Sequence, residues 1–376
     1  MSTSRVSKIA FVAASVLAAA CGSQGAESSR ATTTSPGDTT GGGMRAGAAP
    51  TLRLPDGAAP RRYRASLEID PKATSFRGHI EIDVDVKRAA DQIWLNAQKL
   101  TIEKAILRRG GADTALVAEA APRNFVALRG TIPAGEATLA IDYTGVQDVG
   151  LSNGMGRYTD AGDWYVVTHF EPADARRVFP CFDEPSFKVP WQLTLTVPDG
   201  NIGLSNTPLE HEEKLPDGRH RFQFGATRPL PSYLIALAVG PFETVDAGKT
   251  RKGLAMRIVV PRGRGGDATY AAAELGKVLG ALEDYTGIPY DYGKLDHLAV
   301  PGTQRGAMEH PGLVTYGPRW LLIRKGESVA ARRAQIGIAA HELAHQWFGD
   351  LVTTAWWDDI WLNEAFATWM APKVIE

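Results

Sequence analysis

Two histidines and a glutamate form an H-E-x-x-H motif at residues 341–345. Residues four positions apart lie on one face of an α-helix, so a helix here directs the imidazoles of His341 and His345 at the same metal ion. Glu342 lies about 100° around that helix, where it reaches a metal-held water without being a ligand. The flanking residues are mostly apolar, which disfavours a pair of solvated surface histidines.

A catalytic zinc ion normally takes three protein ligands and leaves one position for water. Glu364 is the candidate third ligand, because it follows the motif closely in a second segment of helical character. Aromatic and aliphatic residues surround it in the sequence, and an unpaired carboxylate among them would be costly. Asp358 and Asp359 are candidates for orienting the ligands, with ordinary surface acids as an equal alternative. The predicted ligands of one Zn²⁺ per chain are His341, His345 and Glu364.

Apolar and polar residues alternate through much of the region that precedes these motifs, for example over residues 80–86, 139–143 and 191–197. Such alternation is typical of strands with one buried face, and clusters of Pro, Gly and Asp mark the turns between them. We therefore expect an all-β N-terminal domain, a sandwich or saddle, over residues 51–246.

Helical spacing replaces the alternation in residues 247–376. One strand is predicted at 256–260, and helices are predicted at 270–285, at 328–348 and from 361 onward. Gly287 and Gly349 are the expected helix ends, and Pro372 is expected to kink or end the last helix. The second domain is therefore predicted to be α/β, and it carries the H-E-x-x-H motif.

The motif and the later block W-L-N-E-A-F-A at 361–367 resemble the aminopeptidase N family of zinc metallopeptidases, the gluzincins that include the leukotriene hydrolases. Two other segments carry the same resemblance. Residues 306–310, G-A-M-E-H, are similar to the family's exopeptidase motif, and residues 170–185 are similar to a signature late in its N-terminal domain. The resemblance extends from about residue 50 to the last residue. It implies a multidomain chain with a partial, thermolysin-like catalytic domain.

The resemblance further implies a metallo-aminopeptidase with Glu342 as general base on a zinc-bound water. Its substrates would be peptides with a free N-terminus, because Glu309 and Glu171 would bind the α-amino group, which is largely cationic at neutral pH. The family usually has Asn and Gln at the places of His310 and His169, so the preferred first residue is not predicted. The remaining residues that the resemblance implies for substrate binding are Gly306, Ala307, Met308, His310 and His169.

The first 21 residues resemble a bacterial lipoprotein signal peptide. Arg5 and Lys8 precede an apolar run that is too short to span a bilayer and that ends in small residues before Cys21. We expect export to the cell envelope with a lipid anchor at Cys21, and an ordinary secretory signal is the alternative. Residues 22–50 are rich in Gly, Ser, Thr and Ala, which predicts a flexible tether.

The charge balance separates the remaining function classes. The 376 residues hold 41 basic and 42 acidic side chains, so nothing favours a nucleic-acid partner, and membrane contact is expected only through the lipid.

Family members continue past the equivalent of residue 376 and carry a tyrosine there that stabilises the oxyanion, so we expect part of a longer enzyme. The alternatives are a weak or inactive zinc- or peptide-binding envelope protein and a zinc endopeptidase.

Overall fold

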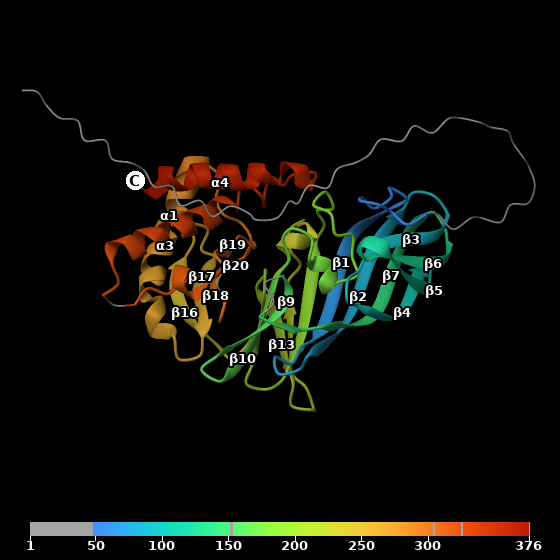
Figure 1. Cartoon of the computed structure of the whole chain (residues 1–376), viewed down its shortest axis with the longest axis horizontal. Coiled ribbons are helices and arrows are strands. Elements are labelled where there is room, and N and C mark those ends of the chain that lie inside the picture. The colour runs from blue at the N-terminus through green and yellow to red at the C-terminus, as the bar shows by residue number, and fades with distance from the viewer. Residues whose placement is uncertain (1–47, 151–152, 304, 325, 376) are drawn as a thin grey trace, which may run out of the picture. The chain divides into compact units, whose positions relative to one another are not determined.

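The computed structural model describes residues 48–150, 153–303, 305–324 and 326–375, and these belong to one compact unit (Figure 1). The predicted signal peptide, Cys21 and nearly all of the predicted tether lie outside the described residues. Within the described ranges the strands form three sheets. No helix of these ranges is both long enough and apolar enough to cross a membrane.

The first sheet has ten strands and is antiparallel apart from the pairing of β1 with β11. In spatial order it contains β13 (Leu209–Lys214), β14 (His220–Phe224), β11 (Trp191–Val197), β1 (Ala58–Glu68), β2 (Ser75–Val86), β7 (Gly135–Val146), β4 (Thr101–Arg109), β5 (Ala112–Ala121), β6 (Phe125–Ile132) and β3 (Ala90–Asn96). The predicted alternation is confirmed in β2, where Ile80, Ile82 and Val84 are at most 1 % exposed. Their side chains pack into the core beneath the sheet, where the rings of Tyr63 and Trp191 stack at 3.7 Å.

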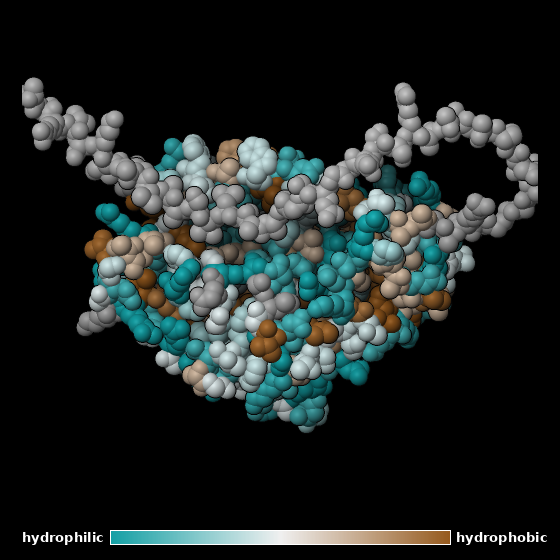
Figure 2. Space-filling view, viewed as in Figure 1, coloured by the Kyte–Doolittle hydropathy of each residue, from teal (hydrophilic) through white to brown (hydrophobic). Residues whose placement is uncertain are grey.

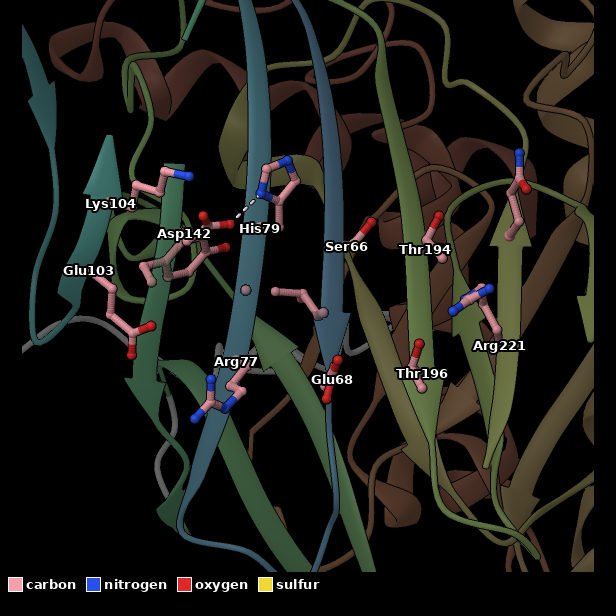
Figure 3. Close-up of a pocket in the computed structure, with 14 residues that line it drawn as sticks. Ser66, Glu68, Arg77, His79, Glu103, Lys104, Asp142, Thr194, Thr196 and Arg221 are labelled. Atoms are coloured by element: carbon pink, nitrogen blue, oxygen red, sulfur yellow. Dashed lines mark hydrogen bonds and ion pairs between the residues drawn. The ribbon is translucent and has the colours of Figure 1, made fainter. Parts of the chain in front are cut away.

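The opposite face of this sheet is polar and forms a groove of about 660 Å³ (Figure 3). Side chains of β1, β2, β11 and β14, among them Ser66, His79, Thr194 and Arg221, line the groove. Its histidine is paired, because His79 Nδ1 lies 2.5 Å from Asp142 Oδ1. On the molecular face shown in Figure 2, hydrophilic and hydrophobic residues are intermixed.

The second sheet carries the segment that leads to the predicted amine-binding residue Glu171. Its order is β12 (Ile202–Ser205), β15 (Leu237–Gly240), β10 (Asp163–His169), β9 (Gly154–Asp160) and β8 (Asp148–Val149). Strand β10 ends at His169, two residues before Glu171.

The third sheet belongs to the second predicted domain. Its order is β16 (Phe242–Lys249), β17 (Ala255–Pro261), β18 (Leu295–Ala299), β20 (Leu313–Tyr316) and β19 (Ala307–Met308). Strands β17, β18 and β20 are parallel, and the short β19 is an edge strand. The predicted domain boundary at 246/247 falls within β16, whose partner is β17. The predicted fold class, a strand-rich domain followed by a mixed catalytic domain, is confirmed.

Four α-helices in the described ranges accompany the third sheet: α1 (Thr269–Thr286), α2 (Pro318–Leu321), α3 (Val329–Ala344) and α4 (Ile360–Ile375). Short 3₁₀ turns occupy Pro122–Asn124, Ala175–Arg177, Ser232–Leu234, Gly265–Ala268 and Trp357–Asp359. Helix α1 contacts β16 and β17, and both α1 and α4 contact α3 (Figure 1). Ser328 caps α3 by accepting a hydrogen bond from the Ala331 amide.

One predicted helix end is wrong. Helix α3 ends at Ala344 and not at Phe348: the chain turns after His345, whose ring bonds the Phe348 carbonyl. Pro372, expected to kink or end the last helix, lies inside α4, which continues to Ile375, so it does not end the helix. By contrast, Gly287 closes α1 as predicted, in the left-handed conformation with φ +68°.

Candidate metal centre

Helices α3 and α4 pack against each other and bring the three predicted metal ligands together. His341 and His345 lie one turn apart on α3, with their Nε2 atoms 3.0 Å from each other. Glu364 on α4 places one carboxylate oxygen 3.2 Å from His341 Nε2 and the other 3.7 Å from His345 Nε2. Ligand atoms of all three residues lie within 4.8 Å of one another, so the group can hold one ion.

The orientation of both imidazoles is fixed by hydrogen bonds on their other nitrogens. His345 Nδ1 lies 2.9 Å from the Phe348 carbonyl oxygen, to which it donates, so its Nε2 lone pair faces the group. His341 Nδ1 lies 3.3 Å from Thr368 Oγ1. Asp358 and Asp359 are exposed. The orienting positions are occupied instead by the Phe348 carbonyl and the Thr368 hydroxyl. The orienting role of Thr368 could have been predicted from the sequence, because Thr368 lies four residues after Glu364 on the same helical face.

Two imidazole nitrogens and a carboxylate oxygen are a donor set that suits zinc, and here they converge on one point. The prediction that apolar residues bury Glu364 is wrong, however. Its side chain is 49 % exposed, and the neighbouring Trp361 and Trp369 are exposed as well, so burial disfavours its carboxylate less than the contact with His341 favours it. The contact with His341 holds the pKa of Glu364 below its usual value.

Three further carboxyl groups lie beside these ligands. Glu342 is buried on α3, and burial, followed by the charge of Glu309, raises its pKa well above the usual value. Glu309 follows β19 and is 2 % exposed, and burial raises its pKa to about 7. Burial and then Glu309 raise the pKa of Glu171. Carboxylate oxygens of Glu171, Glu309 and Glu364 lie within 4.8 Å of one another.

The other predicted substrate-binding residues belong to the same two segments as Glu171 and Glu309. Gly306 and Ala307 lie at the edge strand β19, and the Gly306 carbonyl accepts a hydrogen bond of 2.8 Å from the Gly317 amide. Met308 is buried in the core of the first domain. His310 is fully buried, burial lowers its pKa to about 3, and its ring centroid lies 6.2 Å from that of His169.

Sequence reasoning missed several groups at this site because their contacts join distant parts of the chain. The buried Tyr233 hydroxyl accepts a hydrogen bond of 3.4 Å from Asn363 Nδ2, across 130 positions. Arg305 Nη1 lies 2.6 Å from His169 Nε2. Lys188 Nζ donates to the Asp350 carbonyl at 2.9 Å, in the turn after α3.

Comparison with known proteins decides the family. Residues 59–234 match the Peptidase M1 N-terminal domain, and residues 270–376 match the Peptidase family M1 domain. An aminopeptidase N from Acetobacter pasteurianus is 35 % identical over 327 residues, which cover 85 % of this chain and 91 % of that protein. The chain belongs to peptidase family M1. The resemblance seen in its motifs is thereby confirmed.

Longer relatives of this M1 family member are also similar to it. Aminopeptidase M1-D from Oryza sativa subsp. japonica is 38 % identical over 330 residues, which cover 86 % of this chain. The chain spans 38 % of the length of that relative, and 38 % of the length of aminopeptidase M1-A from the same plant. Both M1 domain matches fall on the parts of the chain that hold the histidines and the clustered glutamates.

Proposed function

We propose that this M1 family member is a zinc-dependent aminopeptidase that hydrolyses the first peptide bond of peptides with a free N-terminus. The observation that carries the proposal is the position of Glu364, which belongs both to the group with His341 and His345 and to the group with Glu171 and Glu309. The proposed metal site and the proposed amine-binding site are therefore adjacent, with Glu364 common to both.

The pair Glu171 and Glu309 suits an ammonium group. Both side chains sit close together where burial disfavours two negative charges, and a substrate cation relieves that repulsion. Because Glu364 lies within 4.8 Å of both, a peptide held by its amine presents only its first peptide bond to the metal ligands. The same arrangement explains why an acetylated N-terminus should not bind.

His341, His345 and Glu364 would hold the ion. Bound there, zinc supplies Lewis acidity, which acidifies water, polarises a peptide carbonyl and favours ionised carboxylates nearby. The Glu342 carboxylate accepts a proton from the attacking water and returns it to the leaving amine. Strand β19, the edge of its sheet, offers free backbone groups to an extended substrate.

We further propose that the mature chain is anchored in the cell envelope through a lipid on Cys21. The support is the apolar run of residues 9–20 directly before that cysteine. Its test is the intact mass of the protein from its own source, in which a diacylglycerol-sized increment on Cys21 is expected and an unmodified residue 21 contradicts the anchor.

Hydrolysis of alanine p-nitroanilide and of its N-acetyl derivative tests the activity. We expect the zinc-loaded chain to cleave only the free amine, and Glu342→Gln to lower kcat by about 100- to 10,000-fold with zinc affinity retained. Equal cleavage of both substrates would indicate an endopeptidase. Stoichiometric zinc binding without cleavage of either would indicate a binding protein instead.

A further inference from the structure

A small cavity of about 20 Å³ is lined by sequence neighbours of the two carboxylates that we assign to the substrate amine. His169, two residues before Glu171, forms one side, and Gly306 and Ala307, just before Glu309, form another. Arg305 and Thr315 also line the cavity. A space of this size holds about one water molecule.

The guanidinium of Arg305 is fixed in this cavity by two neutral acceptors. Its Nη1 lies 2.6 Å from His169 Nε2, and its Nη2 donates to the side-chain oxygen of Asn153. Burial, and then the charge of Arg305 itself, lower the pKa of His169, so the imidazole is neutral and accepts the hydrogen bond.

The positive charge of Arg305 is left without a direct counterion. Within the described ranges it makes no ion pair with a carboxylate, and its buried Nε has no hydrogen-bond partner. Glu171 and Asp174 act on it only through longer-range attraction. An arginine stays protonated even when burial lowers its pKa, so the cavity contains a fixed cation with an unused donor.

The side chain of a substrate's first residue branches from the carbon that carries the amine. With the amine at Glu171 and Glu309, that side chain enters the space in front of Arg305. We propose that Arg305, positioned by His169 and Asn153, makes the cavity a subsite for a carboxylate, so that the chain prefers peptides beginning with Glu or Asp. This inference rests on the aminopeptidase function proposed above.

Charge matching supports this assignment. The substrate ammonium faces two carboxylates, and an acidic side chain faces the guanidinium of Arg305, which makes no ion pair with a carboxylate of the described residues. Such a carboxylate bonds the guanidinium edge, which favours planar two-oxygen acceptors. A lysine or arginine side chain instead brings a second positive charge to Arg305.

Binding of amino-acid amides to the full chain, measured by calorimetry, tests the proposal without needing turnover. Glutamic acid α-amide and glutamine α-amide differ only in the side-chain carboxylate. We expect the acidic amide to bind about 10- to 100-fold more tightly, as for a hydrogen bond to a charged group. Arg305→Met should bring the two dissociation constants to within about threefold of each other, and Arg305→Lys should keep part of the preference.

Arg262→Met is the matched control, because Arg262 pairs with Asp163 on the surface and lies outside this cavity. It should leave the preference for the acidic amide unchanged. Equal binding of both amides to the wild-type chain, or a preference that survives in Arg305→Met, overturns the proposal.

Cleavage of the glutamyl and glutaminyl p-nitroanilides provides the second readout. We expect kcat/KM to favour the glutamyl substrate, and this preference should be lost in Arg305→Met mainly through KM. A preference in binding with no cleavage of any anilide overturns the aminopeptidase function and leaves the acidic subsite standing. If none of the amides binds, both the amine site and the subsite are wrong.

Discussion

At the residue scale, the buried carboxylate of Asp350 beside the candidate site is electrostatically unfavourable when it is ionised. Its side chain is 1 % exposed, and neither carboxylate oxygen has a hydrogen-bond partner among the described residues. Burial, and then the charge of Glu309, raise its pKa well above the usual value, while Lys188 opposes the shift. The folded state therefore disfavours the ionised form of Asp350.

We predict that Asp350→Asn stabilises the zinc-free protein, and more so at high pH. Because the folded pKa lies above the unfolded one, the folded protein loses stability as the pH rises past the usual carboxyl value of about 3.9. The amide has no such ionisation, so its Tm should exceed that of the wild type by a few degrees at pH 8 and by little at pH 4.5. Thermal unfolding in EDTA measures this. The exposed Asp56→Asn is the control, and an equal gain at both pH values contradicts the electrostatic cause.

The residues that could be predicted are those whose partners lie close in sequence. His341 and His345 share a helical face, and Glu364 follows 19 positions later, so spacing and residue type were sufficient. The grouping of Glu171 with Glu309 came only from the family resemblance, because 138 positions separate them. Nothing local marked Asp350 as buried, since its burial depends on how the two domains pack.

At the scale of elements, the turn that follows α3 holds one metal ligand in place. Gly349 has φ +126°, and a Cβ there would lie 3.3 Å from His345 Nδ1. This is the nitrogen that donates to the Phe348 carbonyl. A side chain at residue 349 would therefore press on the nitrogen that orients His345.

We predict that Gly349→Ala lowers zinc affinity about 10- to 100-fold, because it displaces the group that orients a ligand. Competition with a chelator of known affinity measures the effect. Gly337→Ala is the matched control, since Gly337 lies on α3 and its added Cβ meets nothing within 4 Å. That change should leave zinc affinity unaltered and stabilise the helix by about 1 kcal/mol. Equal zinc affinities of Gly349→Ala and the wild type would falsify the orienting role.

Element types were more predictable than element limits. The alternation of residues 80–86 predicted a strand because one face of β2 is buried, and that pattern is local. The predicted end of α3 was wrong because the chain turns after His345, whose ring bonds the Phe348 carbonyl. The pairing of β16 with β17 is likewise a tertiary choice, which alternation alone does not specify.

At the scale of the whole molecule, the amine-binding part of the candidate site forms only when both domains are folded against each other, whereas the metal ligands all come from α3 and α4. Glu171 comes from the end of β10, whereas Glu309 and Glu364 come from the second domain. Asn206 Nδ2 donates to the carbonyls of Leu234 and Pro311, each at 2.9 Å, and so ties the two domains beside Glu309. Binding of a substrate amine should therefore depend on the packing of the two domains.

Zinc should stabilise the folded chain through mass action, because its ligands converge only in that state. At free zinc about 100 times the dissociation constant, the expected gain is about 2.7 kcal/mol, seen as a higher Tm than in EDTA. Glu364→Gln removes one ligand and should lose most of that gain at the same zinc concentration. Asp358→Asn, an exposed acid six residues earlier, should keep it. If Glu364→Gln gains as much as the wild type, the carboxylate of Glu364 is not a ligand, and the ion must be held elsewhere than between α3 and α4.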